Sequence, residues 1–302
     1  RGQKEIKDDL KEAVDLLEKI ALQDADIDKD GHVTMKQGTA KGRIISVNDP
    51  EMRHGRKTSS KLSDGYKAEI VTGGEKASIV IGIELDGANV ADGEHMADLI
   101  DGCKADGNEI DKLYGDTAYC DWEEIEKREE EGMKFCVKVS QAINGTGGYT
   151  KEDFHIDIDN GKVTCPGGHT GEFDPGKIKE REGATVRFDA DTCNQCPHKE
   201  QCTKSQNGRT IGINPYEDRI QQQREYQKTE VFKKDYSKRP NGERTIAQLT
   251  RHGGRKSRYV GKSKTKWQLI MTAINNNVKA VMGFIAMKLQ DAAKGEVCPE
   301  AA

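Results

Sequence analysis

Two aspartates of this chain stand where short apolar stretches end, a position at which a folded sheet can gather acidic side chains. Asp49 closes the stretch Arg43-Ile-Ile-Ser-Val-Asn-Asp49, and the following Pro50 favours a turn. Asp116 closes Lys112-Leu-Tyr-Gly-Asp116. Carboxylates bind hard divalent cations, and two such ions about 4 Å apart can stabilise the charge that develops when a phosphodiester bond is cut or joined. An Asp at a strand end is more often a solvated turn residue, so the pair indicates only a candidate metal site.

Four of the eight cysteines form a cluster: Cys165, Cys193, Cys196 and Cys202. Cys193 and Cys196 are separated by two residues, a spacing from which both thiolates can bind one zinc ion at Zn–S distances of about 2.3 Å. Cys202 and Cys165 can complete a four-cysteine site, with His169 as the competing fourth ligand. Clustering favours metal over a secreted disulfide framework. We expect structural zinc here, and incidental spacing or redox chemistry is the alternative.

A third acidic pattern, Asp26-Ile-Asp28-Lys-Asp30-Gly31, opens like a calcium-binding loop. Its twelfth position is Gln37 rather than the bidentate Glu of such loops, and the residues that follow do not favour a helix. The segment is therefore interpreted as a polar linker with Asx turns.

Basic residues are concentrated between Lys228 and Lys266, where thirteen Lys and Arg face three Asp and Glu, although the whole chain has a net charge of −4. Such a stretch is typical of a surface that binds phosphate backbones, and a solvated helix face is the alternative. No apolar run approaches the roughly 20 residues that cross a bilayer, and the first residues are too polar for a secretory signal. We expect a cytoplasmic protein without membrane contact. Because the chain opens without Met, we also expect an N-terminal region that is missing here.

Apolar periodicity predicts the elements that would position these residues. We expect helices at 4–23, 93–104, 121–131, 216–234, 242–250 and 267–289, and strands at 43–49, 66–72, 78–85, 112–116, 134–140, 154–158 and 185–189. Three hairpin-linked strands, a helix, a strand, a helix and a strand follow the order of an RNase H-like sheet. The predicted organisation is an N-terminal helix and linker (1–42), a first core segment (43–144), a cysteine-rich insert (145–208) and a second core segment (209–302). The insert has few large apolar side chains, so zinc would supply much of its folding energy.

Short motifs in the first core segment resemble those of DDE-class bacterial insertion-sequence transposases. They are Gly65-Tyr-Lys67, Asn89-Val-Ala-Asp-Gly93 and Asp116-Thr-Ala-Tyr119. The last corresponds to the family's "D-x-x-Y" segment, which carries its second catalytic aspartate. The resemblance implies that Asp49, which ends the opening strand, is the first.

The third acidic residue comes from a family signature of the form Y-x2-R-x3-E-x6-K. This chain has Tyr236, Arg239 and Glu243 with the expected spacing, but Thr250 occupies the lysine position, so Arg251 or Lys256 would take over that contact. Residues 251–262 resemble the family's basic "R-x-R-Y-x-G" region, and Tyr259 or Trp267 could stack on an exposed base. The cysteine-rich insert resembles the one found in one branch of these transposases, between the second Asp and the Glu.

The resemblance implies an α/β protein in which an RNase H-like mixed sheet, flanked by helices, carries a small β-rich zinc-binding insert. It implies metal-dependent DNA cleavage and strand transfer at the ends of an insertion sequence, with two Mg2+ or Mn2+ ions held by Asp49, Asp116 and Glu243. Double-stranded DNA would be the partner, bound by a homo-oligomer in the bacterial cytoplasm near the nucleoid. The expected DNA contacts are Arg56, Lys57, Tyr236, Arg239, Arg244, Arg251, Arg255, Lys256, Arg258 and Lys262.

Two alternatives stay open. The chain can be a catalytically inactive DNA-binding protein derived from such a transposase, or a zinc-ribbon interaction module beside an unrelated α/β domain. If Asp49 proves badly placed, Asp64 or Asp86 becomes the candidate first ligand.

Overall fold

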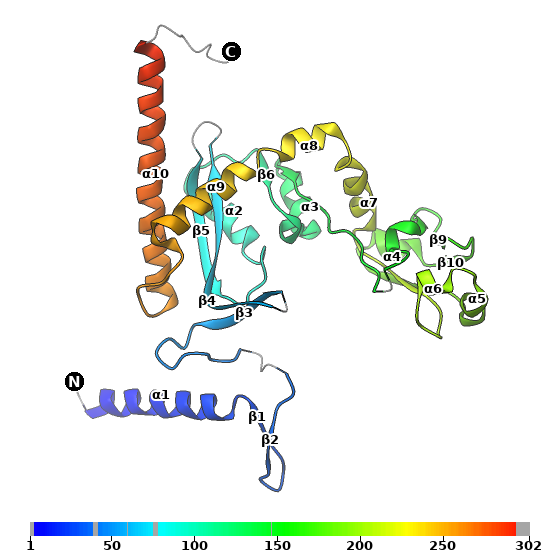
Figure 1. The fold of residues 1–302 in the computed structure, drawn as a ribbon, viewed down its shortest axis with the longest axis horizontal. Coiled ribbons are helices and arrows are strands. Elements are labelled where there is room, and N and C mark those ends of the chain that lie inside the picture. The colour runs from blue at the N-terminus through cyan, green and yellow to red at the C-terminus, as the bar shows by residue number, and fades with distance from the viewer. Residues whose placement is uncertain (1–2, 39–41, 59, 75–77, 146, 294–302) are drawn as a thin grey trace. The chain divides into compact units, whose positions relative to one another are not determined.

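The computed structural model describes residues 3–38, 42–58, 60–74, 78–145 and 147–293. The chain divides into two compact units (Figure 1). Unit 1 combines the residues up to Glu109 with those from Arg239 onward, and unit 2 comprises Ile110–Lys238.

Unit 1 begins with helix α1 (Gln3–Leu22), which confirms the helix predicted at 4–23. A short antiparallel hairpin of β1 (Ala25–Ile27) and β2 (Val33–Met35) follows. Its turn contains the calcium-like pattern, where Oδ1 of Asp28 accepts hydrogen bonds from the backbone N–H groups of Asp30 (2.9 Å) and His32 (2.8 Å). The Asx-turn interpretation is therefore confirmed, while the flanking hairpin was not predicted.

The main sheet of unit 1 has three antiparallel strands in the order β3 (Arg53–Thr58), β4 (Lys61–Gly73) and β5 (Ile79–Gly87). The strands predicted at 66–72 and 78–85 are confirmed. The strand predicted at 43–49 is wrong, because the Gln23 side-chain amide, rather than a neighbouring strand, bonds both the N–H (2.8 Å) and the C=O (3.0 Å) of Ile44. The first strand of the sheet is instead the basic segment that starts at Arg53.

Helices cover both faces of this sheet: α2 (Met96–Ala105) on one, α9 (Pro240–Leu249) and α10 (Lys262–Ala293) on the other. Leu249 of α9 and Ala273 of α10 pack with Val80 and Ile83. Gly82 lies against the side chains of Leu99 and Cys103 in α2. Since neighbouring strand residues point to opposite faces, the sheet is enclosed between the two groups of helices.

Helix α10 runs along β5, the outer strand of the three (Figure 1). The Asn277 side chain accepts a hydrogen bond from the N–H of Val80 and donates one to its C=O, both at 2.8 Å. Among the described residues, α10 is the one helix that passes the length and composition test for a membrane span, with a mean hydropathy of 1.2. A single such helix is weak support for a span, and here Lys279 and three successive asparagines interrupt the apolar sequence.

Unit 2 opens with a parallel pair, β6 (Lys112–Tyr114) and β7 (Lys134–Cys136), connected by α3 (Trp122–Glu130). The Asp121 carboxylate caps α3 by accepting hydrogen bonds from the N–H groups of Glu123 and Glu124, and α3 confirms the helix predicted at 121–131. The α/β class is thus confirmed. In the described part of the chain, β6 and β7 form a sheet separate from β3–β5, rather than one continuous RNase H-like sheet.

The cysteine-rich part of unit 2 has an apolar core of its own, which the sequence analysis did not expect. Its elements are β8 (His155–Asp157), β9 (Lys162–Thr164), β10 (Thr170–Glu172), α4 (Pro175–Lys179), β11 (Ala184–Arg187), α5 (Ala190–Gln195), α6 (Lys199–Cys202) and β12 (Thr210–Ile213). The core consists of Phe154, Ile156, Val163, Ile178, Val186, Phe188, Ile211 and Ile213. The expectation that the insert lacks a core is wrong because β12, beyond the predicted boundary at 208, pairs with β11 and contributes two of these side chains.

The long helix predicted at 216–234 is two helices, α7 (Glu217–Tyr226) and α8 (Glu230–Tyr236). Thr229 starts the second one, since its hydroxyl accepts the N–H of Phe232 at 3.2 Å.

Candidate functional site

The first candidate carboxylate, Asp49, is buried in unit 1 with only 5% of its surface exposed. Its Oδ1 accepts a hydrogen bond from the Tyr66 hydroxyl at 2.6 Å, and its Oδ2 accepts one from the backbone N–H of Gly261 at 3.0 Å. Burial, together with the bond to this carboxylate, raises the pKa of Tyr66, so its hydroxyl stays a donor. Asp49 therefore links β4 to the residue before α10.

A second carboxylate joins Asp49 at the start of α10. Oε2 of Glu51 accepts the N–H of Lys262, the first residue of the helix, at 2.8 Å. Negative charge is favourable at a helix N-terminus, where backbone N–H groups have no partner within the helix. Gly261 adopts φ +94°, which a residue with a side chain rarely does. The segment Asp49-Pro-Glu51 is thus an N-terminal cap for a helix that begins more than 200 residues later.

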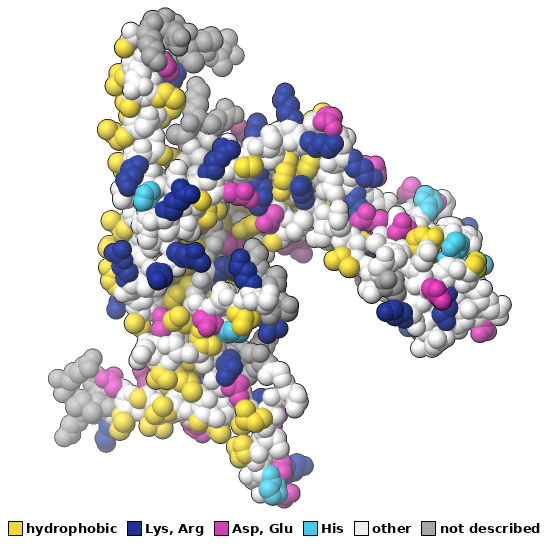
Figure 2. All heavy atoms as spheres, viewed as in Figure 1, with side chains coloured by type: hydrophobic (Ala, Val, Ile, Leu, Met, Phe, Trp, Pro, Cys, Tyr) yellow, Lys and Arg dark blue, Asp and Glu magenta, His cyan; other side chains and the backbone are white. Residues whose placement is uncertain are grey.

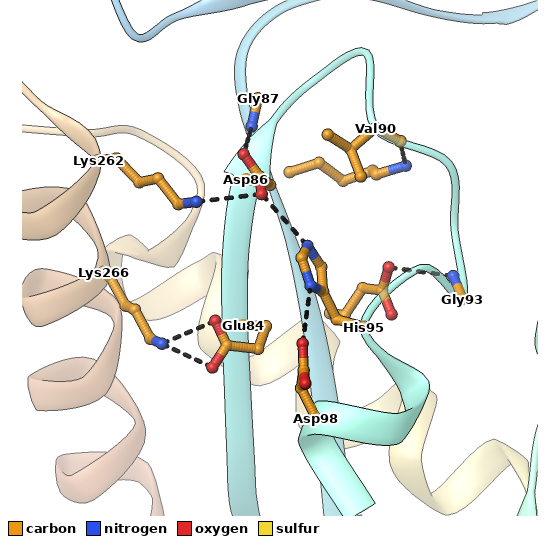
Figure 3. A network of polar contacts seen from close by, with 11 residues as sticks. Glu84, Asp86, Gly87, Val90, Gly93, His95, Asp98, Lys262 and Lys266 are labelled. Carbon is orange, nitrogen blue, oxygen red and sulfur yellow. Dashed lines mark hydrogen bonds and ion pairs between the residues drawn. The ribbon is translucent and has the colours of Figure 1, made fainter. Parts of the chain in front are cut away.

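Behind this cap, a network of charged side chains joins β4, β5, α2 and α10 (Figure 3). Asp86 accepts from the N–H of Gly87 at 2.8 Å and pairs with Lys262 (3.0 Å) and His95 (3.3 Å). Burial acts to raise the pKa of Asp86, but the hydrogen bonds from Gly87 and Lys262 more than offset it, and the net pKa is lowered. Lys266 binds both oxygens of Glu84 at 2.8 Å. These pairs fix the first turns of α10 to the end of β5.

The same network explains why two motifs of the sequence analysis come together. Lys67 donates to the carbonyl of Val90 and pairs with Asp92 at 2.9 Å, so the Gly65-Tyr-Lys67 segment holds the loop before α2. Glu69 is 3% exposed, and its Oε1 accepts the N–H of Gly93 at 3.0 Å. Its Oε2 is buried and finds no hydrogen-bond partner among the described residues, and burial raises the pKa of this carboxyl.

Glu243, the third candidate carboxylate, lies on α9 in unit 1 and is exposed. Its Oε1 accepts a hydrogen bond from Arg239 at 2.8 Å. The preceding residue, Gly242, lies against Thr72 of β4, since a Cβ there would be 2.9 Å from the Thr72 hydroxyl. Tyr66, which holds Asp49, is six residues earlier on the same strand, about 20 Å away at about 3.3 Å per residue.

The structure therefore does not bring Asp49 and Glu243 together. Asp64 and Asp86, the alternative first ligands, are no closer to Glu243, because both lie at the same end of the sheet as Asp49. Asp64 pairs with His54 at 2.5 Å at the start of β4, and Asp86 lies opposite Lys67 near the end of β5.

Asp116 lies in unit 2, two residues past the end of β6. Its side chain accepts the N–H of Ala118 at 3.0 Å and caps the 3-10 turn η1 (Thr117–Tyr119). Gly115 permits this turn, because a Cβ there would come within 2.8 Å of the Tyr119 side chain. The "D-x-x-Y" segment thus forms a tight turn that presents a partly exposed carboxylate.

The side chains expected to contact DNA fall into two groups: some are exposed, and others are already paired within the protein. Exposed side chains are Arg56, Arg251, Arg255, Lys256 and Arg258. The last four follow α9 in the π-helical turn η3 (Thr250–Gly254) and the segment before α10, and Figure 2 shows Lys and Arg gathered over this part of unit 1. Tyr259 and Trp267, both exposed, make an edge-to-face contact with ring centroids 6.4 Å apart.

Four other expected contacts have partners within the protein. Arg239 pairs with Glu243 as described, and Arg244 donates to the side chain of Asn241 at 2.9 Å. Lys262 pairs with Asp86. Tyr236 stacks on Phe232 with centroids 5.3 Å apart, and Lys138 lies over its ring. The side chain of Lys57 lies outside the described part of the chain.

The four clustered cysteines line one cavity of about 350 Å³ in unit 2, together with His169 and His198. A Cβ on Gly167 would lie 3.3 Å from Sγ of Cys196 and 3.6 Å from Sγ of Cys165. All four thiols are free. Burial, with a further contribution from the other three sulfurs, raises the pKa of Cys202. Four soft donors around one space are a set that suits zinc.

The cysteine sulfurs and histidine nitrogens that line this cavity do not form a close cluster. Over the described ranges, the one set of three His, Cys, Asp or Glu ligand atoms within 4.8 Å of one another is Asp28, Asp30 and His32. That set lies on the exposed β1–β2 turn, where hydrogen bonds within the turn account for its geometry.

Residues 164–282 match the family described as transposase DDE domain. This part of the chain is similar to that family. The match includes all four clustered cysteines and Glu243, and it supports a function in DNA transposition. Asp49 and Asp116 lie outside it. No curated protein and no solved structure matches the chain.

Sequence reasoning missed the side chains that hold the candidate carboxylates. Tyr66 was noted only as part of a motif, and its role follows from the hydroxyl bond to Asp49. Glu51 and Gly261 carry a weak local signal, since an acidic pair around a proline and a glycine before a helix both suit capping. Glu69 and His95 carry no signal in sequence that separates them from surface residues.

Proposed function

We propose that this chain is the catalytic part of a transposase that cleaves and joins DNA at the ends of an insertion sequence, in the bacterial cytoplasm. The match of residues 164–282 to the transposase DDE domain carries this proposal, because it contains Glu243 and the basic segment that follows it. Exposed arginines in 251–258 suit a phosphate backbone, which cationic side chains bind with release of counterions. On DNA the protein would work as a homo-oligomer.

Asp49, Asp116 and Glu243 remain our candidates for holding two Mg2+ or Mn2+ ions. Bound ions would polarise the scissile phosphate and activate a water or a DNA 3′-hydroxyl. The residues of unit 1 do not fit a shared site as they stand, since Asp49 and Glu243 lie at opposite ends of β4. Each of the three carboxylates can therefore be tested separately by substitution.

The cysteine cavity of unit 2 suits zinc better than the three carboxylates suit a shared pair of Mg2+ or Mn2+ ions. Cys165, Cys193, Cys196 and Cys202 would hold one ion, with His169 as the alternative to Cys165. With four protein ligands the ion would be structural, tying α5 and α6 to the loop between β9 and β10. Because this region also has an apolar core, zinc would add to its stability rather than create its fold.

The decisive experiment is nicking of DNA that carries the element's own ends, in Mn2+, by the wild type and Glu243→Gln. The glutamine keeps the shape and removes a ligand charge, so the nicking rate should fall by at least about 100-fold while DNA binding persists. The matched control is Glu230→Gln, another exposed glutamate in the first turn of a helix, which pairs with Lys233. A Glu243→Gln protein that nicks at the wild-type rate ends the catalytic assignment.

A second candidate function is DNA binding without catalysis, as in an inactive transposase derivative. It is favoured by the paired state of Glu243 with Arg239 and by the capping role of Asp49. In that case the wild type binds DNA in a salt-dependent manner and does not nick it. Arg239→Ala should then weaken binding and lower the salt dependence by roughly one unit of slope.

A further inference from the structure

Helix α10 has a second side that nothing in the described chain covers. One side is packed on the sheet, with Leu269, Ala273 and Asn276 buried. The opposite side exposes apolar side chains along its length, visible as yellow spheres on α10 in Figure 2. Six of them form what we call the apolar stripe, with 43–56% of each residue exposed: Trp267, Met271, Ile274, Val278, Val281 and Ile285.

The spacing of the apolar stripe identifies the kind of partner that fits it. Successive members are four, three, four, three and four residues apart, so every second member lies seven residues further along the helix. That is the repeat by which two helices keep one seam in contact as they wind around each other. Ile270, Met282 and Leu289, also exposed, widen the seam on either side. The complementary surface is therefore another helix with the same repeat.

The charges around the apolar stripe favour a second copy of this helix. The positions that flank the seam are uncharged: Gln268, Ile270, Asn275, Asn277, Met282 and Phe284. Along the apolar stripe itself, two copies can therefore approach without like-charge repulsion, and the lysines that continue its repeat, Lys264 and Lys288, lie beyond its two ends. A bilayer fits poorly, because Asn277 and Lys266 on the other side of the helix are bound to the sheet.

The area available is that of a stable dimer. The nine apolar residues of the stripe and its edges are 37–66% exposed. If each contributes about 80 Å², roughly half of a large side chain, one copy offers about 700 Å² and a pair buries about 1,400 Å², within the range of specific interfaces.

We propose that two copies of the chain pair through α10, with the apolar stripe of one against that of the other. The pairing requires neither DNA nor the candidate carboxylates. Its failure would therefore leave the proposed function untouched, and a protein that does not nick DNA could still dimerise.

The test is sedimentation equilibrium of the full chain without DNA at micromolar concentrations. The wild type should show twice the chain mass of 33.5 kDa. Ile274→Glu with Val281→Glu places four carboxylates in the seam of a pair and should raise the dimer dissociation constant by at least about 100-fold. The matched control, Ala286→Glu with Gln290→Glu, adds the same charge at exposed positions of α10 outside the stripe and should leave the constant unchanged.

Further measurements keep the outcome unambiguous. Thermal unfolding by circular dichroism should be the same for both double variants, and if the first is unfolded, the neutral pair Met271→Gln and Val278→Gln replaces it. A wild type that stays monomeric at about 100 µM overturns the proposal, as does equal dissociation of the control. So does a chain that is monomeric and floats with phosphatidylcholine vesicles, which would assign the stripe to lipid.

Discussion

The two ends of strand β4 hold their carboxylates in opposite ways. At the Tyr66 end, Asp49 is buried and each of its oxygens accepts a hydrogen bond from a distant part of unit 1. At the Thr72 end, Glu243 is exposed and paired with Arg239, the N-cap residue of the same helix, four residues earlier. A buried carboxylate that accepts two hydrogen bonds stabilises the folded state, whereas an exposed i,i+4 ion pair adds little to the free energy of unfolding. Glu243 can thus change partners at low cost, and Asp49 cannot.

The largest effect should come from removing the buried carboxylate. Asp49→Ala leaves the Tyr66 hydroxyl and the Gly261 N–H without acceptors, and we expect the free energy of unfolding to fall by about 3 kcal/mol. Glu243→Ala should change it by less than about 0.5 kcal/mol. Urea unfolding of the two variants provides the comparison, and equal losses would contradict the difference between the ends.

An intermediate effect should come from the backbone at the cap. Gly261→Ala forces a side chain into φ +94° and directs its Cβ toward Oε2 of Glu51, at 3.3 Å. We expect a loss of about 1–2 kcal/mol in the same urea experiment. Gly102→Ala, in the middle of α2 with open space around its Cβ, is the control and should be neutral or slightly stabilising. A neutral Gly261→Ala would mean that the cap tolerates another backbone conformation.

The smallest effect should be a pH dependence from Glu69. Burial raises the pKa of this carboxyl in the folded state, so the folded protein holds the proton more tightly than the unfolded chain. Its contribution to stability is therefore fully present below the unfolded pKa and is lost as pH rises through the folded pKa. Glu69→Gln, which keeps an acceptor for Gly93, should be slightly more stable than wild type at neutral pH and equal to it in acid. Thermal melts across pH 3–8 test this, and a variant that is less stable at pH 7 would refute it.

Local patterns predicted the elements better than the contacts between them. The helices at 4–23 and 121–131 and the strands at 66–72 and 78–85 follow from periodicity and capping residues within each segment. The strand expected at 43–49 fails because Gln23 provides its hydrogen bonds, and nothing near Ile44 in sequence indicates that. A short apolar run indicates that its residues will be buried. Whether it also forms a strand depends on which other segment of the chain hydrogen-bonds with it.

The candidate sites show the same limit. The cysteine cavity was predictable in part, because Cys193, Cys196 and Cys202 are close together in the sequence, whereas Cys165 lies 28 positions before Cys193. Asp49 was predicted as a candidate metal ligand, but its hydrogen bond from Gly261 joins residues 212 positions apart and depends on the packing of α10. The apolar core below the cysteines was missed because two of its members lie just past the point where the glycine-rich composition ends.

Asn277 binds Val80 as a neighbouring strand would, through both backbone groups of one residue. A strand edge left open can accept a strand from another molecule and grow into an aggregate. Helix α10 covers this edge of β5, and because Asn277 binds Val80 through a side chain rather than a strand backbone, no further strand can be added there. A chain shortened before Asn277 would therefore lose more than a helix: its sheet would gain an edge able to recruit strands from other copies.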